Sequence, residues 1–383
     1  MPEKKAERPY YPYFDYLRII LASIVMFGHA GLIGWGPSGS VAVDVFFALS
    51  GWLIGGILLK TPVMDLPRFY FNRAVRIWVP YYVALVLLLT ASILKDPVDG
   101  KWLEFVIYKV TWVYNLFGSS QLKDCRGCMP LDGTGNHFWS VNAEEQFYLL
   151  APLLLVALVR PGRWVITWIA LASALLLLKS YAAISFGVLM AVINSRYPEF
   201  YLKTGIRIIL LSVLLLAMIG MAIRVEDYRF FSPFFSISLV LLIALTGKRQ
   251  SFGAILGGMS YPLYLNHWIG VFMANALLDP FGIRGSGLGY FLATIFNYGI
   301  AFVLFMVIDK RILFLRGGWY NLDRGLMFTF LAYALLVSGM IYGLGMNYSI
   351  HGSVLLSIFL AAAVVVVMRY RKAGFAVLPV SRK

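Results

Sequence analysis

Charged residues are scarce in this chain of 383 residues. Only 13% of the residues are charged, whereas 60% are hydrophobic. A typical soluble domain carries about 25% charged residues, so a soluble protein of this composition would have too little polar surface to cover itself. The shortage of charge excludes an ordinary soluble fold and favours a chain that is solvated largely by lipid.

Acidic residues are rarer still, with 18 Asp and Glu against 33 Lys and Arg, which gives a formal charge of +15. On a soluble protein this excess would suggest nucleic acid. Here the basic residues lie in short segments between apolar runs, as they do in the cytoplasmic loops of membrane proteins. We therefore expect a lipid bilayer and no nucleic acid as partner, with both termini in the cytoplasm.

Cysteine is nearly absent, and the two cysteines form the single motif DCRGC at Cys125 and Cys128. This spacing can bind metal, cycle between redox states or form a disulfide. One pair without a second pair is weak for zinc, and a structural disulfide is favoured. Phosphate-cradling glycine loops and GxSxG motifs are also missing, and we expect no metal site.

Long apolar runs dominate what is present. Their lengths match those that cross a hydrocarbon core of about 30 Å. The sequence predicts an all-α polytopic membrane bundle of about 10–12 transmembrane helices. Residues 1–383 are expected to form one membrane domain, with an outward loop at 95–145 and no appended soluble domain. The predicted helices are 17–36, 41–59, 77–94, 146–159, 164–179, 181–194, 206–223, 231–247, 252–278, 287–308, 325–345 and 350–368.

Ionisable residues within such helices are costly and mark candidate functional sites. Arg18 and His29 lie eleven residues apart in the first run, which is roughly 16 Å along one helix face. We expect Arg18 at the cytoplasmic edge, where it could hold a phosphate-bearing donor, and His29 near mid-membrane as a general base. A histidine hydrogen-bonded between helices would give the same pattern.

The second run reads VAVDVFFALSGWLIGG and contains Asp44 and Ser50. Its antiparallel course places Ser50 at a depth similar to that of His29. Asp44 could orient an imidazole or bind a substrate hydroxyl, or it could be a helix-end residue at the interface. Gly51, Gly55 and Gly56 permit close approach of another helix.

Two further motifs carry charges. In PRFYFNRAVRIWVP, Arg73 and Arg76 are one turn apart at a helix end, where they could grip phosphate; the positive-inside rule alone could also place them there. In NHFWSVNAEEQFY, Glu144 and Glu145 could hold a histidine or bind a polar acceptor. Acidic residues are equally favourable at a helix N-terminus, and both interpretations remain open.

The motif GGMSYPLYLNHW contributes a second deep histidine, His267, with the hydroxyl of Tyr264 nearby. Pro262 allows a kink whose freed carbonyl needs a partner. The remaining histidines, His137 and His351, fall at the outer ends of predicted helices. We do not expect them to be catalytic.

Taken in order, these motifs resemble the acyltransferase-3 family of membrane acyltransferases. The resemblance rests on FDYLRIILASIVMFGHA, VDVFFALSG, NRAVRIWVPYY, WSVNAEEQFY and SYPLYLNHW, and it covers residues 13 to 310. It implies transfer of an acyl group, often acetyl, from cytoplasmic acyl-CoA to a hydroxyl of a glycan or other acceptor at or across the membrane. It further implies a bacterial cytoplasmic (inner) membrane, with acyl-CoA as a co-substrate and no tightly bound cofactor.

The resemblance also assigns residues. His29 matches the essential histidine of the family, Arg18 its partner, Arg73 and Arg76 the donor-binding pair, and Glu144 the acidic position. The lead SGSVAVD departs from the glycine-rich pattern often seen before the Asp-Phe-Phe run. Some relatives carry an attached hydrolase-like domain; without one, this chain is expected to act alone or to pass its acyl group to a partner protein.

These observations predict a membrane O-acetyltransferase-like enzyme with three groups of site residues. The predicted catalytic residues are His29, Glu144 and Asp44; the donor-binding residues are Arg18, Arg73 and Arg76; the cavity residues are Ser50, Glu145, His267 and Tyr264. A transporter or flippase of a lipid-linked or acylated glycan is the alternative, because its inward-facing polar residues would look similar. Only the enzyme would need acyl-CoA.

Overall fold

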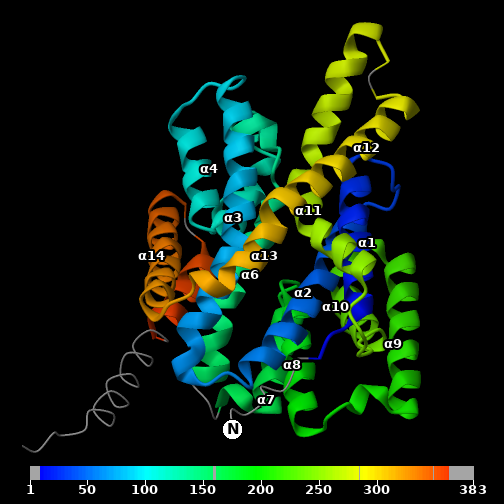
Figure 1. Ribbon diagram of the computed structural model, residues 1–383, viewed down its shortest axis with the longest axis vertical. Helices are drawn as coiled ribbons and strands as arrows, with labels where there is room; N and C mark the ends of the chain where they lie inside the picture. Colours follow the sequence, from blue (N-terminus) through cyan, green and yellow to red (C-terminus); the bar gives the residue numbers. More distant parts are fainter. Residues whose placement is uncertain (1–8, 158–160, 284, 348, 362–383) are drawn as a thin grey trace, which may run out of the picture. The chain divides into compact units, whose positions relative to one another are not determined.

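A computed structural model describes residues 9–157, 161–283, 285–347 and 349–361. All regular secondary structure in these ranges is helical (Figure 1). Five described segments are long and apolar enough to cross a membrane: Ser38–Leu58, Val63–Ile93, Thr204–Ile223, Gly287–Trp319 and Leu322–Met346. The predicted all-α polytopic membrane protein is therefore confirmed.

Helices occupy the other predicted ranges as well, although several are short or only partly apolar. The last one runs from Ile350 to Ala361; positions 362–368 of the prediction lie outside the described residues. Helix α12 (Gly287–Leu304) continues through a π-helical turn into α13 (Lys310–Trp319), beyond the predicted end at 308. The hydrophobic pattern thus located the helices better than it located their ends.

Three boundaries differ from prediction in ways that matter for function. α1 (Pro12–His29) ends at His29 rather than 36, because Gly31 adopts a positive φ of 73° and Pro37 follows. α3 (Leu66–Ile93) begins well before 77, so Arg73 and Arg76 lie inside it and not at its end. α6 (Phe138–Pro152) begins before 146, which makes Glu144 its seventh residue. The dipole at a helix N-terminus acts within the first turn and does not explain Glu144.

The chain divides into two compact units, which are described separately. The first holds Met1–Leu53 and Trp168–Arg311, and the second holds Ile54–Thr167 and Ile312–Lys383. The first unit contains α1, α8 (Ala182–Arg196), α9 (Thr204–Ile223), α10 (Tyr228–Leu242), α11 (Ser251–Leu278) and α12, with most of α2 (Ser38–Leu58) and α7 (Val165–Leu177). Within it α11 packs against α1 and α12, and α10 packs against α8 and α9 (Figure 1).

Glycine allows two helices of the first unit to meet at backbone distance. A Cβ on Gly51 of α2 would lie 2.1 Å from the carbonyl oxygen of Ile184, and one on Gly187 of α8 would lie 2.3 Å from that of Ala48. No other residue fits this crossing. The predicted close approach is confirmed at Gly51, where it fixes the part of α2 that carries Asp44 and Ser50 against α8. At Gly56 the prediction is wrong, because a Cβ there would have no atom within 4 Å.

The second unit is built on α3, which packs against α14 (Leu322–Met346) and α6. The segment predicted as an outward loop contains α4 (Gly100–Val110), α5 (Tyr114–Phe117) and short 3₁₀ turns. Asp99 caps α4 by accepting from the backbone N–H of Trp102 at 2.7 Å, a standard helix start. Cys125 and Cys128 form a disulfide in this segment, as expected.

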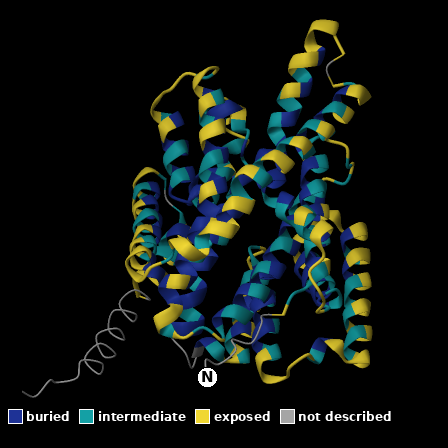
Figure 2. Cartoon of the chain, in the orientation of Figure 1, coloured by how far each residue is buried: buried dark blue, intermediate teal, exposed yellow. Residues whose placement is uncertain are grey.

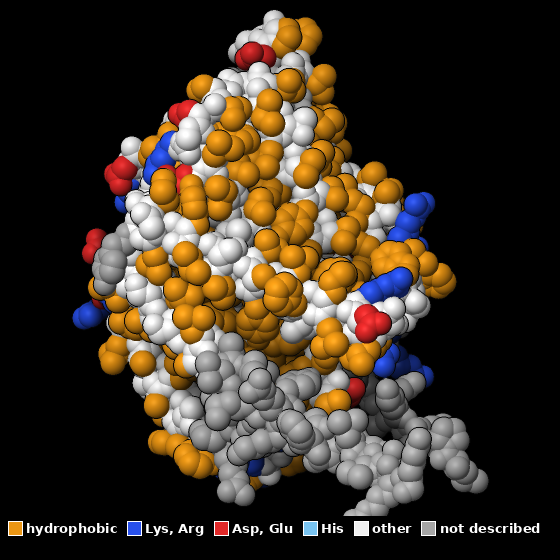
Figure 3. Space-filling model, turned by 90° about the vertical axis from the view of Figure 1, so that its left-hand side faces the viewer, with side chains coloured by type: hydrophobic (Ala, Val, Ile, Leu, Met, Phe, Trp, Pro, Cys, Tyr) orange, Lys and Arg blue, Asp and Glu red, His pale blue; other side chains and the backbone are white. Residues whose placement is uncertain are grey.

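The described surface is rich in exposed apolar side chains, as expected for a protein surrounded by lipid. Only 11% of the most apolar window of α9 is buried, and Figure 2 shows this helix largely exposed. On the face drawn in Figure 3, hydrophobic side chains dominate, and Lys, Arg, Asp and Glu lie mainly toward its margins. Large exposed apolar patches of this kind are unusual in soluble monomers and fit an integral membrane protein.

Candidate active site

The two histidines that were predicted deep in the membrane meet in the first unit. His29 is the last residue of α1, and His267 lies in the interior of α11. His29 Nδ1 is 2.9 Å from His267 Nε2. His29 is exposed and lies at the end of its helix, whereas the predicted range 17–36 had placed it inside one. His267 is 5% exposed.

A second hydrogen bond fixes the ring of His267. Its Nδ1 lies 2.9 Å from the backbone carbonyl oxygen of Tyr264, one turn earlier on α11. The Tyr264 side chain is itself buried and meets Phe46 of α2 edge to face, with ring centroids 6.2 Å apart. We call His29, His267 and Tyr264 the histidine cluster; it joins α1 to α11 through a chain of two hydrogen bonds.

Arg18 lies in the second turn of α1, on the stripe that leads to His29. Its guanidinium is 3.4 Å from the Asp15 carboxylate, and its side chain is 24% exposed. Asp15 also accepts a hydrogen bond from Tyr10. A phosphate-binding role for Arg18 stays a prediction.

Asp44 bonds to a residue that the sequence did not suggest. The hydroxyl of Ser232 on α10 donates to its Oδ2 at 2.7 Å. Ser232 is fully buried, as is Ser236 one turn later, whose hydroxyl has no hydrogen-bond partner among the described residues. Ser50 lies further along α2 and is half-buried. The face of α10 near Asp44 is therefore lined with hydroxyls.

In the second unit, one tyrosine, Tyr148 of α6, contacts two predicted residues, Arg73 of α3 and Glu144 of α6. The Arg73 guanidinium lies 5.3 Å from the centroid of the Tyr148 ring, within cation–π range. The Tyr148 hydroxyl donates to Glu144. Arg76 follows one turn later on α3 and is exposed. We call Arg73, Arg76, Tyr148 and Glu144 the arginine cluster.

Glu145 is held from α3 as well, but by a different residue. The indole N–H of Trp78 donates to its Oε2 at 2.9 Å, and both side chains are buried. The other carboxylate oxygen, Oε1, is buried without a partner among the described residues. An unsatisfied buried carboxylate oxygen is costly and calls for a ligand, water or proton.

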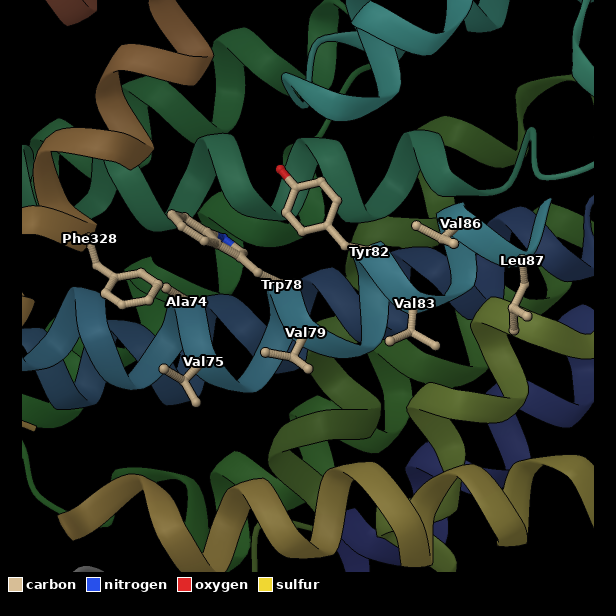
Figure 4. A pocket seen from close by; sticks show the side chains of 9 residues that line it. All are labelled: Ala74, Val75, Trp78, Val79, Tyr82, Val83, Val86, Leu87 and Phe328. Carbon is tan, nitrogen blue, oxygen red and sulfur yellow. The ribbon is translucent and has the colours of Figure 1, made fainter. Parts of the chain in front are cut away.

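Trp78 also lines an open hollow of about 510 Å³ on α3 (Figure 4). The other lining residues are almost all aliphatic, apart from Tyr82 and Phe328 of α14. The hydroxyl of Tyr82 donates to the carbonyl oxygen of Val110 at 2.8 Å and is not turned into the hollow as a binding group. The hollow is thus apolar. Arg73 and Arg76 lie on the same stretch of α3 but are not among the residues that line it.

The predicted site residues therefore form two sets. His29, Arg18, Asp44, Ser50, His267 and Tyr264 belong to the first unit, and Arg73, Arg76, Glu144 and Glu145 belong to the second.

Ser232, Trp78 and Tyr148 were not predicted from the sequence. Tyr148 could have been found from its spacing, because residues four apart on a helix are neighbours. Trp78 stands in the arginine motif, but nothing there indicates that it bonds to Glu145. No signal in the sequence pairs Ser232 with Asp44.

Comparison with known proteins places the chain in a defined context. The family described as an acyltransferase domain matches residues 11–308. The peptidoglycan O-acetyltransferase OatA of Listeria monocytogenes is 31% identical over 40% of this chain and 25% of its own length. A candidate O-acetyltransferase of Staphylococcus aureus is 31% identical over 39% of this chain and 25% of its own length.

A further relative covers more of both proteins. The candidate membrane-bound transacylase BcsY of Komagataeibacter xylinus is 26% identical over 73% of this chain and 78% of its own length. The chain spans about a quarter of the length of the O-acetyltransferases it matches. No solved structure matches it.

Proposed function

Because this chain belongs to the acyltransferase domain family, we propose that it transfers an acyl group, with acetyl as the first candidate, from cytoplasmic acyl-CoA to a hydroxyl of a glycan or related acceptor. The observation that carries the proposal is the hydrogen bond between His29 and His267. It joins two imidazoles, the side chains best suited to proton transfer near neutral pH, in a protein that lies in a membrane.

The chemical step needs a base for the acceptor. The acceptor hydroxyl attacks the thioester carbonyl while His29 takes its proton. The tetrahedral intermediate collapses, the carbon–sulfur bond breaks, and the proton passes from His29 to the departing sulfur. The products are an ester and free CoA. A positioned base of this kind contributes roughly 10²–10⁴-fold in rate.

The arginine cluster suits the donor. Coenzyme A carries phosphates, and guanidinium groups bind phosphate through parallel N–H donors. Arg76 is exposed, and the Tyr148 ring beside Arg73 is oriented by its hydrogen bond to Glu144. We assign Arg73 and Arg76 to the donor phosphates, with Arg18 as a further donor contact. Glu144 acts on this cluster through Tyr148.

Asp44 and its hydroxyl-lined surroundings suit a polar acceptor. A carboxylate that already accepts from Ser232 can accept a second hydroxyl, and sugars offer many. Ser50 of α2 and Tyr264 of α11 complete the polar lining that we assign to the acceptor. The name of the Listeria relative points to a glycan acceptor there, which supports a glycan here. A partner protein that receives the acyl group is compatible with the same chemistry.

We place the enzyme in a bacterial cytoplasmic membrane with both termini inside. The distribution of Lys and Arg supports this orientation, and cytoplasmic acyl-CoA would then reach the positive side of the protein. A reporter fused to either terminus, with outward fusions in 119–128 as the opposite arm, tests it directly.

Purified protein in nanodiscs with radiolabelled acetyl-CoA tests the activity. Thioester turnover or protein labelling should vanish in His29→Ala. The double variant Arg73→Ala/Arg76→Ala should raise the KM for acetyl-CoA by at least about tenfold, as expected for lost charge-assisted contacts. Arg68→Ala is the matched control, because Arg68 is an exposed arginine on the same helix that lies over Tyr320.

Either of two results contradicts the proposal. Full activity of His29→Ala excludes this histidine as the base. Failure of the wild-type protein to turn over any of a broad panel of acyl-CoAs would instead favour transport of a lipid-linked or acylated glycan, to be followed by a flux assay.

A further inference from the structure

The two hydrogen bonds of the histidine cluster determine where the protons are. A backbone carbonyl oxygen can only accept. Because Tyr264 O lies 2.9 Å from His267 Nδ1, that nitrogen must carry the proton. A neutral imidazole has one N–H and one lone pair, so the Nε2 of neutral His267 carries the lone pair and must accept.

The tautomer of His267 in turn determines that of His29. The Nδ1 of His29 lies 2.9 Å from the Nε2 of His267. Because the Nε2 of His267 accepts, the Nδ1 of His29 must donate. A neutral His29 that donates through Nδ1 has its lone pair on Nε2. The opposite tautomer would place two lone pairs opposite each other across 2.9 Å. The Tyr264 carbonyl therefore sets both tautomers in series.

We infer that His267 is a positioning residue that fixes the tautomer of His29, so that Nε2 of His29 is the atom that takes the proton from the acceptor hydroxyl. This inference rests on the proposed function. In the reaction, Nε2 gains a proton and His29 becomes an imidazolium. Its Nδ1–H then makes a charge-assisted bond to the neutral His267, which is stronger than the bond in the resting state.

The surroundings of His267 suit this role. It is 5% exposed in the interior of α11, and its ring nearly parallels that of His29, with an interplanar angle of 26°. Its neighbour Asn266 donates to the carbonyl oxygen of Pro262 at 3.1 Å, which steadies the same turn. A ring held by packing and by a backbone carbonyl keeps one orientation, as outer partners of catalytic histidines do.

Nitrogen-15 NMR reads these protonation states directly. The chain has only four histidines, so ¹⁵N-histidine-labelled protein in nanodiscs gives a small set of signals that single histidine variants assign. We expect His29 with the proton on Nδ1 in the wild type. In His267→Phe, His29 should shift toward the tautomer protonated on Nε2, which dominates in free histidine.

Kinetics test the consequence. His267→Phe should lower kcat about 10–100-fold, the usual effect of losing an outer hydrogen-bond partner, with the KM for acetyl-CoA changed less than roughly twofold. His267→Gln should recover at least about tenfold of that loss, because a carboxamide can donate to Tyr264 O and accept from His29. His351→Gln removes an exposed histidine elsewhere and serves as the control.

The outcomes distinguish failure of the tautomer inference from failure of the proposed function. An unprotonated Nδ1 on His29 in the wild type overturns the inference, and so does a His267→Phe protein that turns over at the wild-type rate. Equal losses in His267→Phe and His267→Gln, with normal folding of both, also overturn it. The expected tautomer in a protein with no acyl transfer activity would refute the catalytic role and the proposed function together, while the hydrogen-bond chain stood.

Discussion

Replacement of Lys109 by methionine should remove a pH dependence of stability that the wild-type protein carries. Lys109 lies on α4, outside the membrane-spanning segments, and is 2% exposed. Its Nζ donates to the carbonyl oxygen of Gly135 at 3.0 Å and lies 3.6 Å from the centre of the Tyr114 ring. Burial lowers the pKa of Lys109 from 10.5 to about 7.

The sign follows from proton binding. Between pH 7 and 10.5 the unfolded chain keeps its lysine proton while the folded protein has lost it, so the unfolded state binds more protons. The free energy of unfolding therefore rises with pH in this window and is unaffected by Lys109 below it. From pH 7 to pH 9 the gain from this one residue is about 2 kcal/mol.

Thermal unfolding followed by tryptophan fluorescence at pH 7, 8 and 9 measures the effect. Lys109→Met keeps the apolar stem and removes the titrating amine. The difference in stability between wild type and variant should change by about 2 kcal/mol over this range, or roughly 2–3 °C in Tm for a chain of this size. Lys101→Met is the control, because Lys101 lies on the same helix in an ion pair with Glu104.

A difference that stays constant from pH 7 to pH 9 would refute the reasoning. It would mean that the amine titrates alike in folded and unfolded protein. Burial would then not be acting on Lys109 as its packing against Gly135 and Tyr114 indicates.

Two matched pairs of variants test the contacts of α2. Gly51→Ala should destabilise the protein by roughly 1–3 kcal/mol, because its Cβ would meet the carbonyl oxygen of Ile184 at 2.1 Å. Gly56→Ala should be tolerated, because no atom lies within 4 Å of the Cβ position. Thermal unfolding compares the two variants. Asp44→Asn should keep the bond to Ser232 and normal yield but raise the acceptor KM about tenfold. Ser232→Ala should instead lower stability by about 1–3 kcal/mol by leaving Asp44 without this donor. Equal acceptor KM values for wild type and Asp44→Asn would exclude Asp44 from acceptor binding.

The sequence predicted the fold class because apolar runs of membrane length rarely occur in any other kind of fold. It misplaced the start of α3 because the first turns carry Arg68, Arg73 and Arg76, which lower the hydropathy although the helix continues through them. It extended α1 too far because the apolar Leu32 and Trp35 follow the helix, while the backbone turns at Gly31. Hydropathy reports the solvent of a residue, and backbone geometry decides where its helix ends.

The candidate site, like the fold, was predictable from the sequence only in part. The predicted helices contained the site residues of the first unit, whereas Arg73, Arg76, Glu144 and Glu145 fell just before the predicted helices 77–94 and 146–159. The sequence indicated two deep histidines, but it did not predict the hydrogen bond between His29 and His267. Partners on other helices, such as Ser232 for Asp44 and Trp78 for Glu145, depend on the crossing of two helices and leave no periodic trace in the chain.

The polar partners in this protein can serve either of two physical demands, which must be separated. In lipid, a buried polar group has to be satisfied within the protein, so a bond such as that between Trp78 and Glu145 could exist for insertion alone. Catalysis makes a different demand, because its hydrogen bonds must strengthen as charge develops. The chain from Tyr264 through His267 to His29 meets this second demand, since it ends on a nitrogen whose protonation tightens the bond behind it. Substitution of a residue that serves only insertion should lower the yield of folded protein and the activity together. Substitution of His267 should lower the turnover rate while the yield of folded protein stays constant.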